Sequence, residues 1–380
     1  MKRKTSIIFL GVCCVTIAIT CKKPYSPRAT NTDNKFLVID GVILNSMDSP
    51  TVFRLSRTVR LTDSTTESSP ETAATVSVEG SNGEHFSFTE QPAGIYKSNP
   101  LSLSYSSQYR LKITTSNGDA YLSDFVSVSR TPPIDSITWE QQNDVSIYVN
   151  THDPSANTRY YRWDFVETWQ YRSTYNRSIA EKNGIIYYVD STNQTYNCWS
   201  TQPSANILVA STVALDADIV SRQPVALIAQ NDDRIGVRYS ILVKQYALTQ
   251  DAYEYFSILK KNTENLGSIF DAQPTQLSGN LHSVTRPSEV VVGFVAASSA
   301  SQQRIFIDNS QVTNWNTVYN GEDCAQKLIS QDPNDFRFYS YADTSYAPYH
   351  YVSPGGIEIA KRSCVDCSTR GGTTIKPSFW

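Results

Sequence analysis

Two cysteines near the C-terminus, Cys364 and Cys367, have the Cys-x-x-Cys spacing of redox and metal sites. A thioredoxin-like site needs a helix that begins at the first cysteine, whereas a Gly-Gly pair follows here. A zinc site would recruit Cys198, Cys324 or His350, because zinc takes Cys and His ligands. We favour disulfides. Four cysteines allow three pairings, and we expect one cysteine of the Cys-x-x-Cys pair to join Cys324 and the other to join Cys198.

A band of aromatic residues is the best candidate for contact with a ligand or partner. Its members are Tyr161, Trp163, Phe165, Trp169 and Tyr171. The first three share one face of a strand, since side chains alternate along a strand. The first interpretation of that face is packing on a core. The second is contact with a sugar, a peptide or a receptor, because Tyr and Trp offer large amphipathic surfaces to partners.

The sequence contains no complete catalytic motif. Ser257 and Lys260 match the Ser-x-x-Lys pattern of penicillin-recognising enzymes, but the companion motifs are missing. Asp216, Asp218 and the pair Asp232–Asp233 lack the spacing of a calcium-binding EF-hand, so we favour turn and surface roles for them. We predict no catalytic residue, no metal and no cofactor. A hydrolase of glycans or peptides remains the alternative, because folding can bring two carboxylates together.

The N-terminus has the layout of a secretion signal. Basic residues at positions 2–4 precede an apolar run at 5–20 that is too short to span a bilayer. Residues Ala18–Cys21 are similar to a lipobox, in which a signal peptidase cuts before a lipid-bearing cysteine. We expect residues 1–20 to be a lipoprotein signal peptide and Cys21 to carry the lipid anchor. Residues 21–34, rich in Pro, Ser, Thr and Asn, are then a tether.

The composition excludes several classes of protein. The 380 residues include 33 basic and 36 acidic ones, which give a net charge of −3. Removal of residues 1–20 takes away three basic residues and leaves a net charge of −6. That balance argues against a protein that binds nucleic acid by neutralising phosphates. The 23 Tyr, 14 Phe and 6 Trp residues, with only 18% charged residues, favour a β-rich fold over a disordered chain or a coiled coil.

Short strand-like segments follow one another from residue 35 onward, and two turns of the Asn-Gly type, at 82–83 and 117–118, lie between them. We predict a mainly β fold that begins with an immunoglobulin-like or prealbumin-like sandwich over residues 35–131. The Pro-Pro pair at 132–133 interrupts the pattern. We place a domain boundary there, followed by a larger β-rich domain over residues 135–380 with a disulfide-linked C-terminal segment.

One segment of this second domain has helical rather than alternating spacing. In residues 249–265 the apolar residues Ala252, Tyr255, Phe256 and Leu259 recur at intervals of three and four. Thr249 is a candidate N-cap, because its side chain can accept a hydrogen bond from the first turn. The spacing predicts one amphipathic helix in an otherwise β-rich domain.

Several motifs resemble those of a family of Bacteroidota-type envelope lipoproteins known as domain of unknown function 4249. They are Phe36–Gly41, Leu242–Thr249, Gly267–Pro274, Cys364–Cys367 and Lys376–Trp380. Members of that family have no established activity and are typically lipoproteins found near TonB-dependent receptors. The resemblance implies an accessory or binding protein, anchored by lipid in the outer membrane and associated with such a transporter. It leaves open which membrane face the protein occupies, and the alternatives of an envelope hydrolase and a purely structural envelope protein stand beside it.

Overall fold

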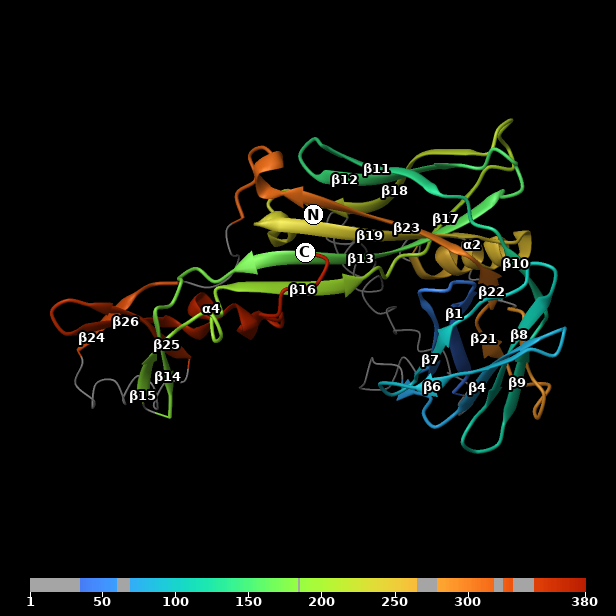
Figure 1. The fold of residues 1–380 in the computed structure, drawn as a ribbon, viewed down its shortest axis with the longest axis horizontal. Helices are drawn as coiled ribbons and strands as arrows, with labels where there is room; N and C mark the ends of the chain where they lie inside the picture. The colour runs from blue at the N-terminus through green and yellow to red at the C-terminus, as the bar shows by residue number, and fades with distance from the viewer. Residues whose placement is uncertain (1–34, 60–68, 184, 265–278, 318–323, 331–344) are drawn as a thin grey trace, which may run out of the picture. The chain divides into compact units, whose positions relative to one another are not determined.

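The computed structural model describes residues 35–59, 69–183, 185–264, 279–317, 324–330 and 345–380. The predicted signal peptide (1–20), the lipidation site Cys21 and the predicted tether (21–34) lie outside these ranges. The prediction of a mainly β fold is confirmed, because strands are the dominant element of the described residues (Figure 1).

The N-terminal part of the chain builds a large sheet, which has thirteen strands within the described ranges. Its hydrogen-bonded order is β20-β9-β8-β10-β22-β1-β2-β7-β6, and β3, β4, β5 and β21 pair at its sides. The strands are β1 (Leu37–Leu44), β2 (Pro50–Arg57), β3 (Ser69–Pro70), β4 (Thr75–Gly80), β5 (His85–Ser87), β6 (Thr89–Glu90), β7 (Ile95–Pro100), β8 (Gln108–Thr114), β9 (Ala120–Ser123), β10 (Val126–Ser129), β20 (Leu281–Ser283), β21 (Val291–Val292) and β22 (Ala296–Ser298).

The two halves of this sheet enclose one core, in the manner of a sandwich. Phe53 and Leu55 of β2 meet Val78 of β4 and Leu111 of β8 in a single buried cluster. Alternate residues of these strands are buried, because alternate side chains point to the same face. The predicted Asn-Gly turns hold, since Gly83 and Gly118 adopt the positive φ angles of 89° and 90° that such turns require.

Strands from the expected second domain complete this sandwich. Strand β22 lies between β1 and β10 and pairs with both in parallel, with Val42 opposite Ala296 and Val128 opposite Ala297. Strands β1 and β10 are not neighbours in the sheet, and β22 joins them. The sandwich expected over residues 35–131 therefore takes in residues 281–298 of the expected domain at 135–380, and residues Phe36–Trp380 form one compact unit. The chain thus returns to this sandwich after the Pro-Pro pair at 132–133.

Two further sheets pack face to face and form the second core. The smaller has the order β11-β12-β18, and the larger has the order β16-β13-β19-β23 with β17 beside β13. Their strands are β11 (Ile134–Gln141), β12 (Val145–His152), β18 (Ile219–Ile228), β13 (Tyr160–Arg172), β16 (Asn197–Pro203), β17 (Leu208–Ser211), β19 (Arg238–Ala247) and β23 (Ala300–Asp308). Ile147 of the smaller sheet and Ile241 of the larger belong to one buried cluster.

The predicted amphipathic helix is confirmed as α2 (Gln250–Glu264). Thr249 caps it, because its Oγ1 accepts a hydrogen bond from the Ala252 N–H at 3.3 Å. Ala252, Tyr255 and Phe256 are buried as the spacing predicts. Burial raises the pKa of Tyr255 to about 12.

Two small sheets remain, one at residues 179–188 and one in the C-terminal part, where the sequence shows little periodicity. Strands β14 (Ile179–Lys182) and β15 (Ile185–Tyr188) make a hairpin, and β24 (Lys327–Ser330), β26 (Gly356–Lys361) and β25 (Tyr346–Val352) make a three-stranded sheet. Short helices follow: α4 (Arg362–Val365) and the 3-10 turn η4 (Cys367–Arg370). Two more 3-10 turns are η1 (Asp233–Ile235) and η2 (Asn309–Gln311).

Candidate binding pocket

Strand β13 positions most of the site, because one of its faces carries every second residue from 161 to 171. Antiparallel pairing places Trp169 of this face opposite Ser200 of β16 and Tyr239 of β19. Residues directly opposite each other share a face, so the three strands present one continuous surface. We call residues 161–165 on this face its closed end and residues 167–171 its open end.

The closed end lies in the second core. Tyr161 and Trp163 have no exposed surface, and Phe165 is 7% exposed. The Trp163 Nε1–H donates to Gln245 Oε1 at 2.8 Å, and the Tyr161 hydroxyl donates to Asp218 Oδ1 at 3.0 Å. A contact with a partner through Tyr161, Trp163 or Phe165 would need a surface that these side chains do not have. For them, the structure shows core packing.

A buried ion cluster lies where the open end meets the closed end. Glu167 is 6% exposed, and its carboxylate accepts hydrogen bonds from Arg234 Nη1 at 3.0 Å and from the Tyr239 hydroxyl at 2.6 Å. Arg234 also donates to Asp232, from Nε at 3.1 Å and from Nη2 at 2.9 Å. One guanidinium thus serves two carboxylates. A carboxylate is buried at this depth only when such a partner compensates the loss of water.

The turn η1 brings Asp232, Asp233 and Arg234 to this surface. Asp232 caps the turn, since its carboxylate accepts the Arg234 N–H at 2.9 Å. Ile235 has no exposed surface and anchors the turn in the second core. The Trp315 indole N–H donates to the Asp232 carbonyl at 3.1 Å. Capping and anchoring together fix the direction in which the Asp233 side chain leaves the backbone.

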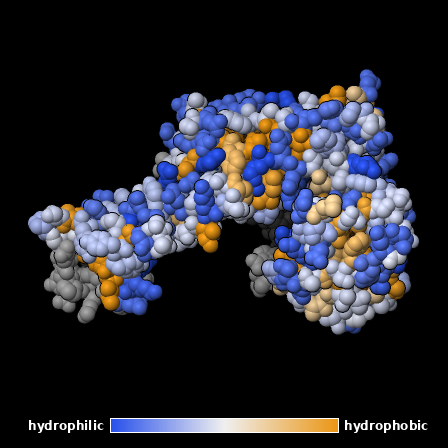
Figure 2. Space-filling model, in the orientation of Figure 1, coloured by the Kyte–Doolittle hydropathy of each residue, from blue (hydrophilic) through white to orange (hydrophobic). Residues whose placement is uncertain are grey.

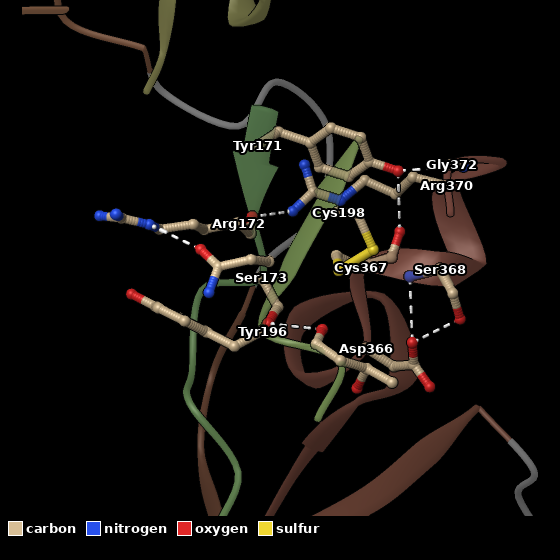
Figure 3. The surroundings of a disulfide bond; sticks show 12 residues. Tyr171, Arg172, Ser173, Tyr196, Cys198, Asp366, Cys367, Ser368, Arg370 and Gly372 are labelled. Carbon is tan, nitrogen blue, oxygen red and sulfur yellow. Dashed lines mark hydrogen bonds between the residues drawn. A yellow bond between two sulfur atoms is a disulfide. The ribbon is translucent and has the colours of Figure 1, made fainter. Parts of the chain in front are cut away.

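The C-terminal segment closes the site from the other side. The predicted disulfides are confirmed: Cys198 joins Cys367, and Cys324 joins Cys364, so the two Cys-x-x-Cys cysteines take separate partners. The first bond ties η4 to β16 beside Tyr171, whose hydroxyl donates to the Cys367 carbonyl at 3.0 Å (Figure 3). The Arg370 guanidinium lies 4.8 Å from the centre of the Tyr171 ring and donates to the Arg172 carbonyl.

These elements enclose a cavity of about 500 Å³ at the open end. It is lined by Trp169, Tyr171, Ser200, Gln202, Asp232, Asp233, Arg234 and Arg370. A cavity of this size accommodates a small ligand. Two of the predicted contact residues, Trp169 and Tyr171, therefore line a concave site, although Tyr171 is only 7% exposed.

Several lining groups have unused capacity for binding. Within the described residues, no hydrogen bond or ion pair involves the Asp233 carboxylate, the Trp169 indole N–H or the polar side-chain atoms of Ser200 and Gln202. The Trp169 ring likewise has no aromatic or cationic partner in the same parts of the chain. The cavity thus offers a carboxylate, an aromatic ring, a hydroxyl and an amide to a bound molecule.

The two neighbouring aspartates of the cavity differ in acidity. Burial raises the pKa of Asp233, and the charge of Arg370 opposes this rise only in part. Burial also acts to raise the pKa of Asp232, but hydrogen bonds from Arg234 and its charge outweigh burial and lower that pKa. At the same depth, Asp232 is therefore the more stable anion, because it has a partner.

A second cavity of about 540 Å³ lies between the sandwich and the other face of the five-stranded sheet. Its lining includes Asp48, Lys97, Lys244 and Gln302, which mix both signs of charge. Tyr246, the aromatic residue of its lining, is 9% exposed. The lining of this cavity contains no half-buried aromatic ring, so we take the open end of β13 as the candidate site.

The surface gives little further guidance. Figure 2 shows hydrophilic side chains over most of the face turned to the viewer, with hydrophobic ones in smaller groups. No helix among the described residues has the length and apolar character needed to cross a bilayer. In the same residues, no group of three or more His, Cys, Asp and Glu side chains is arranged to hold a metal ion.

Sequence reasoning missed Asp233 and Arg370 as lining residues and assigned turn or surface roles to the aspartates. Asp218 is instead 3% exposed and accepts a hydrogen bond from Tyr161. One signal was available. Glu167 falls on the same face as Trp163 and Trp169 by alternation, and a charge within an apolar face requires a buried partner. The triplet Asp232–Arg234 carries such a cation.

Comparison with known proteins places the chain in a family. The profile of the family described as "Domain of unknown function (DUF4249)" matches residues 22–304, well over half of the sequence. The chain belongs to this family. The match covers β13, β16 and η1 of the DUF4249 member, whereas η4, which carries Arg370, lies beyond it. No curated protein matches the sequence.

Two solved structures share weak similarity with this DUF4249 member. One is a DUF4785 family protein from Legionella pneumophila, with 9% identity and a TM-score of 0.18 over 55% of this chain and 52% of that one. The other is trypsin-activated alpha-2-macroglobulin from Escherichia coli, with 9% identity and a TM-score of 0.19 over 57% of this chain and 15% of that one. The chain thus spans about half or less of either protein, and the similarity is too low to bear on function.

Proposed function

We propose that this protein is a non-enzymatic binding protein of the bacterial outer membrane, anchored by lipid on Cys21, which holds a small polar ligand in the pocket at the open end of β13. The observation that carries the proposal is the convergence of Trp169, Asp233, Ser200 and Gln202 on one cavity with binding capacity unused. Ligand sites combine an aromatic or apolar surface with a few well-placed polar groups.

The construction of the pocket supports holding a ligand in a fixed orientation. Its walls come from β13 and β16, which are paired over seven positions from Val166 to Arg172, and from two short turns. One turn is fixed by Asp232 and Ile235, and the other by the Cys198–Cys367 disulfide. A pre-organised site loses little conformational entropy on binding. Such rigidity suits recognition of one class of molecule.

A binding screen with a matched variant tests the proposal. The mature chain from residue 22 is titrated by calorimetry with monosaccharides, amino acids, amines and small organic acids. We expect at least one class to bind with a Kd below about 1 mM, or about −4 kcal/mol, and Trp169→Ala to weaken it at least tenfold. Tyr160→Ala, on the opposite face of β13, is the control and keeps the affinity. Absence of binding by every class, or equal binding by the two variants, would contradict the proposal.

We also propose that the protein associates with a TonB-dependent transporter. This part rests on the family resemblance and on the predicted lipid anchor. Affinity purification from detergent-solubilised membranes, with a Cys21→Ser variant as the unanchored control, is the test. Recovery of such a transporter with the anchored form is the expected result. Recovery of none above background would remove the transporter from the proposal and leave the pocket unaffected.

One observation favours a hydrolase as the second candidate. Asp233 has a raised pKa and adjacent Asp232 a lowered one, and catalytic carboxylate pairs divide their roles in this way. In that case Asp233 is the proton donor to a glycosidic oxygen. Incubation with envelope glycans and analysis of reducing ends by mass spectrometry decides this. Cleavage by the parent protein that is absent in Asp233→Asn supports the hydrolase, whereas intact glycans exclude it for those substrates.

A further inference from the structure

We infer that the ligand of this pocket carries a protonated amine, which is held between the Asp233 carboxylate and the face of the Trp169 indole. The inference rests on the proposed function, since it names the ligand class of the same site. It is based on the excess of carboxylates over guanidinium groups around the pocket, and on the lining groups that make no hydrogen bond or ion pair within the described residues.

The pocket wall and the buried Glu167 behind it together hold three carboxylates and two guanidinium groups. Arg234 is within 3.0 Å of Glu167 and 2.9 Å of Asp232, so one cation already serves two anions. Arg370 contacts the Tyr171 ring and the Arg172 carbonyl, and its charge acts on Asp233 without a direct ion pair between the two described residues. Asp233 is half-buried, its carboxylate makes no hydrogen bond or ion pair within the described residues, and the charge of Arg370 offsets its burial only in part. A positive charge on the ligand would pair with the Asp233 carboxylate and offset the cost of removing that carboxylate from water.

The aromatic ring with free capacity is of the kind that binds cations. A cation is attracted to the face of Trp more strongly than to that of Tyr or Phe. The Tyr171 ring already has the Arg370 guanidinium 4.8 Å from its centre, whereas Trp169 has no such neighbour within the described residues. A carboxylate and an indole ring that line the same cavity together select an ammonium group over a neutral hydroxyl.

The remaining groups indicate what the amine is attached to. The Ser200 hydroxyl and the Gln202 amide lie on β16, opposite Trp169 and Glu167 respectively, and each can both donate and accept. They suit hydroxyl groups on the ligand. The site therefore fits an aminated polyol, such as an amino sugar, better than a simple alkyl amine.

The test compares two molecules that differ only in the amine. Glucosamine and glucose are titrated by calorimetry into the mature wild-type protein and into Asp233→Asn. Asp216→Asn serves as the charge-matched control, because Asp216 is exposed and does not line the pocket. We expect the wild type and Asp216→Asn to prefer glucosamine by at least about tenfold, and Asp233→Asn to bind the two sugars equally. Thermal unfolding of each variant verifies that it is folded.

Four outcomes would overturn the inference. Equal binding of glucosamine and glucose by the wild type contradicts it while leaving a polar-ligand site intact. A preference for glucosamine that survives in Asp233→Asn assigns the amine to another group. In a third outcome, the wild type binds a ligand of the screen that has no amine and fails to bind glucosamine. That result contradicts the assignment of an amine ligand but is consistent with the proposed function. If no ligand of the screen binds, the proposed function fails as well.

Discussion

The closed and open ends of the β13 face carry similar residues in one continuous strand, yet they have different roles. At the closed end, the sheet β11-β12-β18 covers Tyr161, Trp163 and Phe165, and their polar atoms bond to buried groups. At the open end, the turn η1 and the turn η4 of the C-terminal segment stand around Trp169 and leave a cavity. The sequence pattern is the same at both ends, and the covering elements decide whether an aromatic side chain becomes core or binding surface.

The ion cluster of Glu167 and Arg234 marks the transition between the two ends. It seals the core from the cavity with hydrogen bonds rather than with apolar packing. The closed end therefore stabilises the fold, and the open end is where we propose that the ligand binds. Substitutions at the two ends should therefore separate the two properties.

The largest effect should follow loss of the disulfide that builds the open end. The Cys198–Cys367 bond spans 169 residues, and the chain-entropy relation gives about 5 kcal/mol for a loop of that length. We expect Cys198→Ser/Cys367→Ser to lower the free energy of unfolding by about that amount and to weaken ligand binding, since η4 loses its tie to β16. Denaturant unfolding and calorimetry measure the two effects.

The second disulfide is the control for this prediction. Cys324 and Cys364 are 40 residues apart, and the same relation gives about 4 kcal/mol. Neither cysteine lines the cavity. Cys324→Ser/Cys364→Ser should therefore destabilise the protein to a similar degree but preserve ligand affinity. Loss of affinity in both double variants would show that stability alone governs binding.

The next effect contrasts two tryptophans of the same face. Trp163→Ala removes a fully buried ring and leaves Gln245 Oε1 without its hydrogen-bond donor, so we expect a loss of about 4 kcal/mol in unfolding free energy. Trp169→Ala removes a half-buried ring and should cost about 1 kcal/mol. Affinity should change in the opposite order, with at least a tenfold loss for Trp169→Ala. Equal effects of the two substitutions on stability would refute the distinction between the ends.

The smallest effect has the opposite sign. Burial raises the pKa of Asp233 above its ordinary value of 3.8, so its charge destabilises the fold at any pH above that raised pKa. Asp233→Asn should therefore stabilise the protein at pH 7, by on the order of 0.5 kcal/mol. The gain should disappear below about pH 3.8, where the carboxyl is protonated in both folded and unfolded chains. Thermal unfolding of the wild type and of Asp233→Asn across this pH range measures the effect. A variant that is less stable than the wild type at pH 7 would contradict the prediction and would show that the Asp233 carboxylate has a stabilising partner.

Much of the fold follows from local sequence, and the pocket does not. Thr249 and the spacing of Ala252 to Leu259 predict α2, and the alternation of residues 160–171 predicts β13. Strand β22, at residues 296–298, pairs with β10 near residue 128. A pairing between segments so far apart in the chain cannot be predicted from a local sequence pattern. The pocket draws on β13, β16, η1 and η4, so its lining spans residues 169 to 370. Only the charge of Glu167 within an apolar face hints at it from sequence.

Hydrogen exchange with and without ligand tests the central claim most directly. With saturating glucosamine, the account predicts slower exchange in peptides that cover residues 167–172, 199–202 and 231–236, at the open end. Exchange in peptides that cover residues 145–152 and 161–165, at the closed end, should not change. Protection at both ends alike, or protection confined to residues 91–97 and 242–246 beside the second cavity, would contradict the account.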